Sequence, residues 1–175
     1  MLGFFRKDDS VKVVDRVWMT SSAKYAACAA MLKANPNCIF VAWFEDTAAT
    51  LKNILGNDAP VFLAHEITPA QIRFKLVIMT EHYPLMQREQ EFFKRMQLNN
   101  VPVLSALDEP MFMQFGGERT VELLKKLGIE EDEILGHGMI SSSIRKVQKK
   151  ISDSVKNEQK AASKRDWFAL NFKVF

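Results

Sequence analysis

The sequence predicts an α/β domain built on a mostly parallel sheet of about five strands. Between Val11 and Leu107, short runs rich in β-branched and aromatic residues alternate with segments of helical period. Two of these runs, residues 39–44 and 76–79, are almost continuously apolar, as expected for strands buried on both faces. The chain has 175 residues, 47% of them hydrophobic, so it is long and apolar enough to form one core.

Helix start and stop signals separate the predicted strands. Thr20 and the two serines after it can cap a helix that runs to about Ala34, and Asp46 can cap one that ends before Gly56. A third helical pattern covers residues 85–98. In the first helix, small residues are expected to face the sheet: Ala23, Ala26, Ala27, Ala30 and Met31. The strand candidates are residues 13–19, 38–44, 60–65, 75–80 and 101–107.

Beyond Leu107 the pattern is helical to the end of the chain, which favours a division into residues 1–128 and a helical extension, 129–175. An apolar stripe ends at Gly128, so residues 115–127 are expected to close the sheet. The acidic residues 130–133 favour a helix start. A long amphipathic helix is expected over residues 139–162, with one narrow apolar seam formed by Ile140, Ile144, Val147, Ile151 and Val155.

The formal net charge of +3 is unevenly distributed. Residues 139–175 contain nine Lys or Arg against three Asp or Glu, whereas residues 1–138 are net acidic. Such a basic helix suits an acidic protein partner, an anionic membrane surface or nucleic acid, and it also suits a plain solvated helix face. No apolar run reaches 18 residues, and residues 1–9 become charged too early for a signal peptide, so we expect a cytoplasmic protein without a transmembrane segment. Cys28 and Cys38 lack metal-ligand spacing and are expected to be buried thiols.

The stretch from Ser105 to Lys150 has an order of parts that resembles one protein family. It contains Ser105-Ala106-Leu107-Asp108-Glu109, then Phe115-Gly116-Gly117-Glu118-Arg119, an acidic patch and a basic amphipathic helix. This order resembles SecA, the ATP-driven preprotein translocase motor, where a similar run closes the second RecA-like motor domain and enters a long scaffold helix. Thr80-Glu81-His82 resembles another segment of that domain, T-E-R-H. The resemblance implies a RecA-like three-layer domain followed by a C-terminal helical extension.

The chain departs from the SecA pattern where that family handles nucleotide. The connection at residues 67–73 has no glycine, the segment after His82 reads as an ordinary helix, and no Gly-x-x-x-x-Gly-Lys-Ser/Thr string occurs. We therefore expect no ATPase activity and no cofactor. The resemblance implies a non-catalytic binding or regulatory module, with a translocase-related protein or a second copy of the chain as partner. A nucleic-acid-binding remnant of a helicase-type motor is the first alternative.

A small-ligand or metal site is the second alternative. His65-Glu66 and Glu81-His82 each follow a predicted strand, at the edge where parallel α/β sheets bind ligands. These pairs could form a metal or acid/base site if their strands are neighbours, or each could simply hydrogen-bond within its own loop. His137, between two glycines, is interpreted as structural.

Partner contacts are expected on the long basic helix and on the aromatic end of the chain. The candidate residues are Ile144, Arg145, Lys149, Ile151, Trp167 and Phe168. Residues 166–175 are expected to fold back onto the body or to pack on a second copy, since chain ends rich in aromatic residues are ordered only where they dock.

Overall fold

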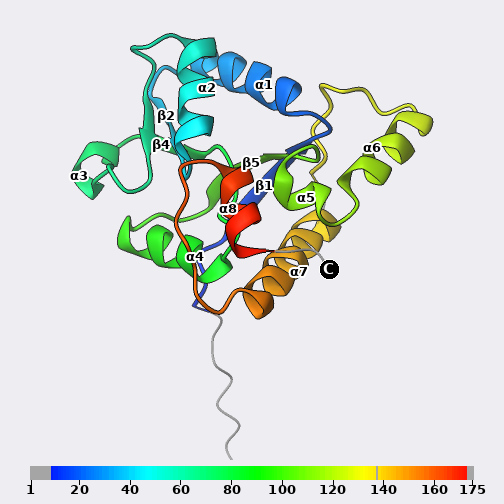
Figure 1. Cartoon of the computed structure of the whole chain (residues 1–175). Coiled ribbons are helices and arrows are strands. Elements are labelled where there is room, and N and C mark those ends of the chain that lie inside the picture. The colour runs from blue at the N-terminus through cyan, green and yellow to red at the C-terminus, as the bar shows by residue number, and fades with distance from the viewer. Residues whose placement is uncertain (1–8, 137, 173–175) are drawn as a thin grey trace, which may run out of the picture.

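A computed structural model describes residues 9–136 and 138–172 of the chain. It contains a five-stranded, all-parallel sheet with the strand order β1-β5-β4-β2-β3 (Figure 1). The expected fold class, a RecA-like α/β domain with helices at the C-terminal end, is confirmed. All five predicted strands are present, each slightly shorter than expected. The strands are β1 (Val13–Trp18), β2 (Cys38–Ala42), β3 (Val61–Leu63), β4 (Leu76–Met79) and β5 (Val101–Ala106).

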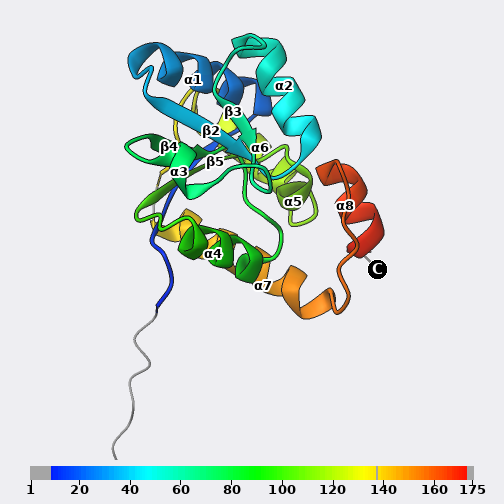
Figure 2. The ribbon, with the colours of Figure 1, turned by 90° about the vertical axis from the view of Figure 1, so that its left-hand side faces the viewer.

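The helices form layers on the two faces of the sheet (Figure 2). One layer contains α1 and α2, and the other contains α4 with α7 beside it, while α8 lies near α5 at one end of the sheet. The helices are α1 (Ser21–Ala34), α2 (Glu45–Leu55), α3 (Pro69–Ile72), α4 (Met86–Arg95), α5 (Pro110–Met113), α6 (Gly117–Lys126), α7 (Gly138–Ser154) and α8 (Lys164–Asn171).

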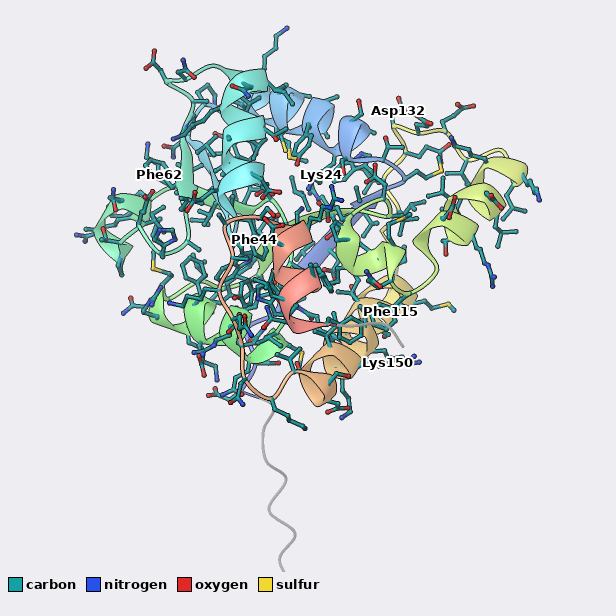
Figure 3. All side chains as sticks on the ribbon, viewed as in Figure 1. Lys24, Phe44, Phe62, Phe115, Asp132 and Lys150 are labelled. Atoms are coloured by element: carbon teal, nitrogen blue, oxygen red, sulfur yellow. The ribbon has the colours of Figure 1, made fainter. Side chains whose placement is uncertain are left out.

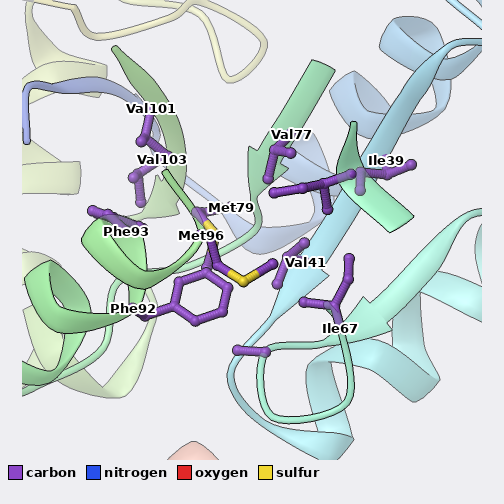
Figure 4. Close-up of a cluster of buried hydrophobic side chains, with 12 residues drawn as sticks. Ile39, Val41, Ile67, Val77, Met79, Phe92, Phe93, Met96, Val101 and Val103 are labelled. Atoms are coloured by element: carbon purple, nitrogen blue, oxygen red, sulfur yellow. The ribbon is translucent and has the colours of Figure 1, made fainter. Parts of the chain in front are cut away.

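Alternation along the strands divides the apolar residues between two cores. In β2, Ile39 and Val41 face the α4 side, where they join Met79, Phe92 and other buried residues (Figure 4). Cys38, Phe40 and Ala42 face the opposite side, under α1 and α2. This arrangement follows from the two-residue period of a strand and explains why β2 is buried along its whole length.

Helix α1 buries the expected stripe only in part: Ala23, Ala27 and Met31 pack against the core. Ala26 and Ala30 are exposed, whereas Lys24 and Cys28 are fully buried. The helix is therefore rotated relative to the prediction, because the ammonium of Lys24 has ionic partners at the end of the sheet. Cys28 and Cys38 are buried free thiols, as expected.

Helix α6 does not close the sheet, contrary to the prediction. Leu123 in the helix and the C-cap residue Leu127 are 57% and 68% exposed. The chain turns away from the body at Gly116, whose φ of 87° suits glycine, and at Gly117, where a Cβ would lie 2.2 Å from the carbonyl oxygen of Leu107.

The free edge of β1 is instead bridged by the connection that follows α6. The amide of Leu135 donates a hydrogen bond to the carbonyl of Val17 over 2.7 Å, in an isolated antiparallel bridge. A short bridge of this kind protects part of the edge from further strand pairing.

Helix α7 ends at Ser154 and not near Ala162 as expected. The chain then reverses through residues 155–163, and Ser163 caps α8 by accepting a hydrogen bond from the amide of Asp166. Tertiary burial overrides the helical pattern here, because Trp167 and Phe168 are buried in a third core with α5 and α7. The predicted folding back of the chain end onto the body is thus confirmed as far as Phe172. Other predictions concern residues 1–8, His137 and residues 173–175, which lie outside the described residues.

Candidate functional site at the carboxyl ends of the strands

Four charged side chains meet where the strands end at their carboxyl termini. Glu81 follows β4, Glu109 follows β5, Lys24 lies in the first turns of α1, and Lys164 is the first residue of α8. All four are buried. Figure 3 shows Lys24 and Phe44 near the start of α8. In open parallel sheets this edge is the usual place for a ligand.

The two lysines and the two glutamates form one connected cluster, which we call the strand-end cluster. The Nζ of Lys164 lies 2.7 Å from Oε2 of Glu81 and 2.9 Å from Oε1 of Glu109. The ammonium of Lys24 pairs with Glu109 and donates a hydrogen bond to the carbonyl of Thr80 over 2.8 Å. Each charge therefore faces an opposite charge, as a buried ion requires.

Glu81 also fixes the chain at the end of β2. Its Oε1 accepts hydrogen bonds from the amides of Trp43 and Phe44, at 2.9 and 3.0 Å, and its Oε2 accepts one from the hydroxyl of Thr47 at 2.6 Å. A carboxylate at this position satisfies amides at the start of α2 and lies at the favourable end of the helix dipole.

The pKa shifts follow from these contacts. Burial alone would raise the pKa of Glu109, but the nearby ammonium groups of Lys164 and Lys24 lower it to about 2. Burial would lower the pKa of Lys164, but Glu109 and Glu81 raise it overall. The strand-end cluster is thus a set of fixed, mutually neutralised charges, which suits a structural role better than proton transfer near neutral pH.

A second buried cluster surrounds His82. Its Nε2 lies 2.8 Å from Oδ1 of Asp15 in β1, and its Nδ1 lies 2.9 Å from Oε1 of Glu89 in α4. The amide of Tyr83 also donates to Glu89, over 3.1 Å, and Gln148 of α7 donates to Glu89 over 3.2 Å. The His82 cluster therefore joins β1, α4 and α7.

The two carboxylates keep the imidazole protonated. Burial would lower the pKa of His82, but Glu89 and Asp15 raise it to about 10. Although burial would raise the pKa of Asp15, the hydrogen bond and charge of His82 lower it. An imidazolium held between two carboxylates is a poor general base at neutral pH.

The structure separates the four residues proposed for a ligand or metal site. The side chains of His65 and Glu66 are 68% and 61% exposed, and the Nε2 of His65 lies 4.0 Å from the Oε1 of Glu66. Glu81 belongs to the strand-end cluster, whereas the ring of His82 points to Asp15 and Glu89. Across residues 9–136 and 138–172, no three His, Cys, Asp or Glu side chains are grouped so that they could hold a metal ion.

The partner-contact candidates fall into two groups. Ile144, Ile151, Trp167 and Phe168 are buried in the third core by the chain's own residues, whereas Arg145 and Lys149 are exposed on α7. Lys150, next to Lys149, lies 5.7 Å above the ring centre of Phe115, and Figure 3 shows the two side by side. The outward surface of α7 is thus basic, and at the edge of this surface Lys150 contacts Phe115 of the body.

An open groove of about 770 Å³ lies beside the strand-end cluster. Its walls include Trp43, Tyr83 and Phe92. The ring of Trp43 packs against the other two, with centroid distances of 4.9 Å to Tyr83 and 5.0 Å to Phe92. Residues 158–162, between α7 and α8, form another wall, held by Glu158, which accepts hydrogen bonds from Tyr83 and from Trp167. This wall is therefore tied to α8 through the hydrogen bond between Trp167 and Glu158.

Sequence reasoning identified Glu81 and His82 at this edge but missed Lys24, Glu109 and Lys164 as members of a site. No local signal marked Lys24, because a lysine in an alanine-rich helix is ordinarily exposed to solvent. Together, the fold and the site define a RecA-like parallel α/β domain whose strand-end edge is closed by its own C-terminal helix.

Comparison with known proteins points to one translocase subunit. The chain is 39% identical over 46 residues to the protein translocase subunit SecA 1 of Alkaliphilus metalliredigens, and 39% identical over 49 residues to SecA of Christiangramia forsetii. These matches cover 26% and 28% of the chain but only 5% and 4% of those proteins. A longer match to SecA of Parabacteroides distasonis has 25% identity over 114 residues, which is 63% of the chain and 10% of that protein.

No protein-family model matches the chain. The similarity to SecA is therefore strongest over short segments and weak over the longer span. None of the helices in the described part of the chain is long and apolar enough to cross a membrane.

Proposed function

We propose that this chain is a non-catalytic protein-binding module that acts in preprotein export, on the cytoplasmic side. The similarity to SecA supports the link to translocation. The proposal that the module is non-catalytic is supported by the closed strand-end edge. Lys164 and α8 lie where an open parallel sheet would receive a ligand. Because every charge of the strand-end cluster already has a partner, a substrate would first have to displace α8.

The binding surface in this proposal is the exposed face of α7. Ile144, Gln148 and Ile151 point inward, so the opposite side of the helix carries the exposed cations. Those cations are Arg145, Lys146, Lys149 and Lys150. The surface therefore suits an acidic region of a partner protein.

The test is a binding measurement with a purified SecA, such as the Parabacteroides distasonis protein, by surface plasmon resonance. Arg145→Glu combined with Lys149→Glu is expected to weaken binding at least tenfold, since two attractive contacts become repulsive. The matched control is Lys33→Glu with Lys52→Glu, which reverses two exposed charges on α1 and α2. Equal binding by both double variants, or no binding by the unmodified chain, would contradict the proposal.

The same exposed cations favour one competing function, nucleic-acid binding. Such binding is dominated by contacts to phosphates and weakens steeply as salt rises. A filter-binding assay with single-stranded and duplex DNA at 50 and 200 mM salt distinguishes the two functions. Tight, salt-sensitive retention that is lost in the α7 double variant would favour the nucleic-acid function over the protein-binding one.

A further inference from the structure

The segment that joins α7 to α8, residues 155–163, has a local preference that its conformation does not satisfy. Its sequence, Val-Lys-Asn-Glu-Gln-Lys-Ala-Ala-Ser, has no proline or glycine and is composed largely of good helix formers. It follows directly on a 17-residue helix and leads directly into an eight-residue helix. Yet none of its residues is helical. Such a conflict shows that tertiary contacts, and not local preference, hold the segment in its bent form.

The docked position of α8 depends on a small number of specific contacts. Lys164, Trp167 and Phe168 lie one helical turn apart, at positions i, i+3 and i+4, and all three are buried. The lysine enters the strand-end cluster, and the indole Nε1 of Trp167 donates a hydrogen bond to Glu158 over 2.9 Å. The receiving surface therefore requires an ammonium followed one turn later by two aromatic rings.

The connecting segment has its own contacts in the bent form. The amide of Glu45 donates to the carbonyl of Ala162 over 2.9 Å, and Gln159 exchanges two hydrogen bonds with the side chain of Asn171, at 2.6 and 2.7 Å. Straightening the segment into a helix would break the contact with Glu45, both hydrogen bonds between Gln159 and Asn171 and the bond between Trp167 and Glu158 of the same copy, but would add about one intrahelical hydrogen bond for each residue made helical. Hydrogen bonds within the segment are thus gained as tertiary ones are lost, and the tertiary contacts of α8 can be made again with a second copy.

We propose that α8 is exchanged between two copies of this chain when residues 155–163 become helical. The continuous helix would then run over residues 138–171 and would be ~51 Å long, since each residue adds about 1.5 Å. Lys164 would lie roughly 15 Å beyond Ser154 along the axis and could not return to its own strand-end cluster. Each copy would insert α8 into the empty site of the other, as in other domain-swapped dimers.

A second copy is the occupant that fits the vacated site. The site contains two buried carboxylates, Glu81 and Glu109, against the single remaining ammonium of Lys24, so it needs one further cation. Only α8 of the described chain presents a lysine followed at i+3 and i+4 by tryptophan and phenylalanine. The exchanged α8 restores the same ion pairs and the same aromatic packing, so the site is complete only with the partner copy's Lys164.

The test compares the monomer–dimer ratio of full-length variants by size-exclusion chromatography with light scattering. Asn157→Ala combined with Ser163→Ala removes a weak helix former and the α8 cap, so the ratio of dimer to monomer is expected to rise roughly tenfold. Lys156→Gly combined with Ala162→Gly lowers the helix propensity at two exposed positions of the segment. This variant is expected to lower the ratio of dimer to monomer by a similar factor.

Two further measurements separate exchange from simple loosening of α8. Tryptophan emission of the dimer should match that of the monomer, because Trp167 is buried in both forms. Adding Lys164→Met to the Asn157→Ala, Ser163→Ala variant should abolish the dimer, because the ion pairs of Lys164 are what hold the exchanged α8 in the other copy. An unchanged ratio in the alanine variant, a higher ratio in the glycine variant, or a dimer that survives Lys164→Met would overturn the proposal.

Discussion

The ammonium of Lys164 lies 2.9 Å from a carboxylate oxygen of Glu109, although 55 residues separate the two in the chain. This ion pair joins the last described helix to the end of strand β5, in a site closed to solvent. It therefore connects the position of α8 to the stability of the whole domain.

Replacing Lys164 by methionine should destabilise the fold by about 3–5 kcal/mol, because Glu81 and Glu109 would then share one ammonium in a buried site. Urea unfolding followed by circular dichroism measures the change. Lys160→Met, at an exposed position in the preceding loop, is the control and should change stability little. If the two variants unfold at the same urea concentration, the strand-end cluster does not hold α8.

Glu109 should make the stability of the chain depend on acid pH. Its pKa in the folded state is about 2, below the ordinary value of 4.5, so its contribution is present above about pH 4.5 and is lost as the pH falls toward 2. The shift corresponds to on the order of 3 kcal/mol. Glu109→Gln should be less stable than the unmodified chain at pH 6 and should lose less stability between pH 5 and pH 2. Parallel stability curves for the two proteins would rule out this role.

His82 should make the stability of the chain fall as the pH becomes alkaline. Its pKa is raised from 6.5 to about 10, so the stabilisation by its imidazolium is complete below pH 6.5 and is lost as the pH rises through about 10. His82→Gln should therefore lose less stability between pH 7 and pH 10 than the unmodified chain does. Thermal melts across this range test the prediction, with His65→Gln, at an exposed ring, expected to follow the unmodified curve.

The two thiols should resist modification until the domain opens. Cys28 and Cys38 are buried, and burial raises the pKa of the Cys28 thiol to about 12, so little thiolate is present at neutral pH. Reaction with a thiol reagent at pH 8 should be slow in buffer and complete within the dead time in 6 M guanidinium. Rapid reaction of both cysteines in buffer would show that the α1 side of the sheet opens readily.

The strands were predictable because a buried parallel strand has a local signature. Residues 38–42 and 76–79 are apolar whatever lies around them, so the sequence pattern alone located β2 and β4. The boundaries of α1 and α2 were found to within one or two residues, and the predicted cap of α1 is confirmed, since the side chain of Thr20 accepts a hydrogen bond from the amide of Ala23. The predicted cap of α2 is wrong, because Asp46 lies inside the helix and the N-cap residue is Phe44, which makes no side-chain capping bond.

The site was less predictable because its members are distant in sequence. Lys24 and Glu109 are 85 residues apart, and neither carries a mark of burial in its own neighbourhood. A lysine in an alanine-rich helix is expected on the solvent side, so the buried face of α1 was predicted only in part. The end of α7 was misplaced for the same reason, since residues 155–163 favour a helix and only the docking of α8 prevents one.

Native-state hydrogen exchange of α8 tests the central claim, that the strand-end edge is closed by the chain's own C-terminal helix. At a concentration where the chain is monomeric, the amides of Trp167 and of Phe44 should exchange far more slowly than those of an unstructured peptide, because both donate hydrogen bonds in the closed form of this edge. Exchange of the α8 amides at the rate of an unstructured peptide, with β2 still protected, would contradict the claim, because it would show an open strand-end edge.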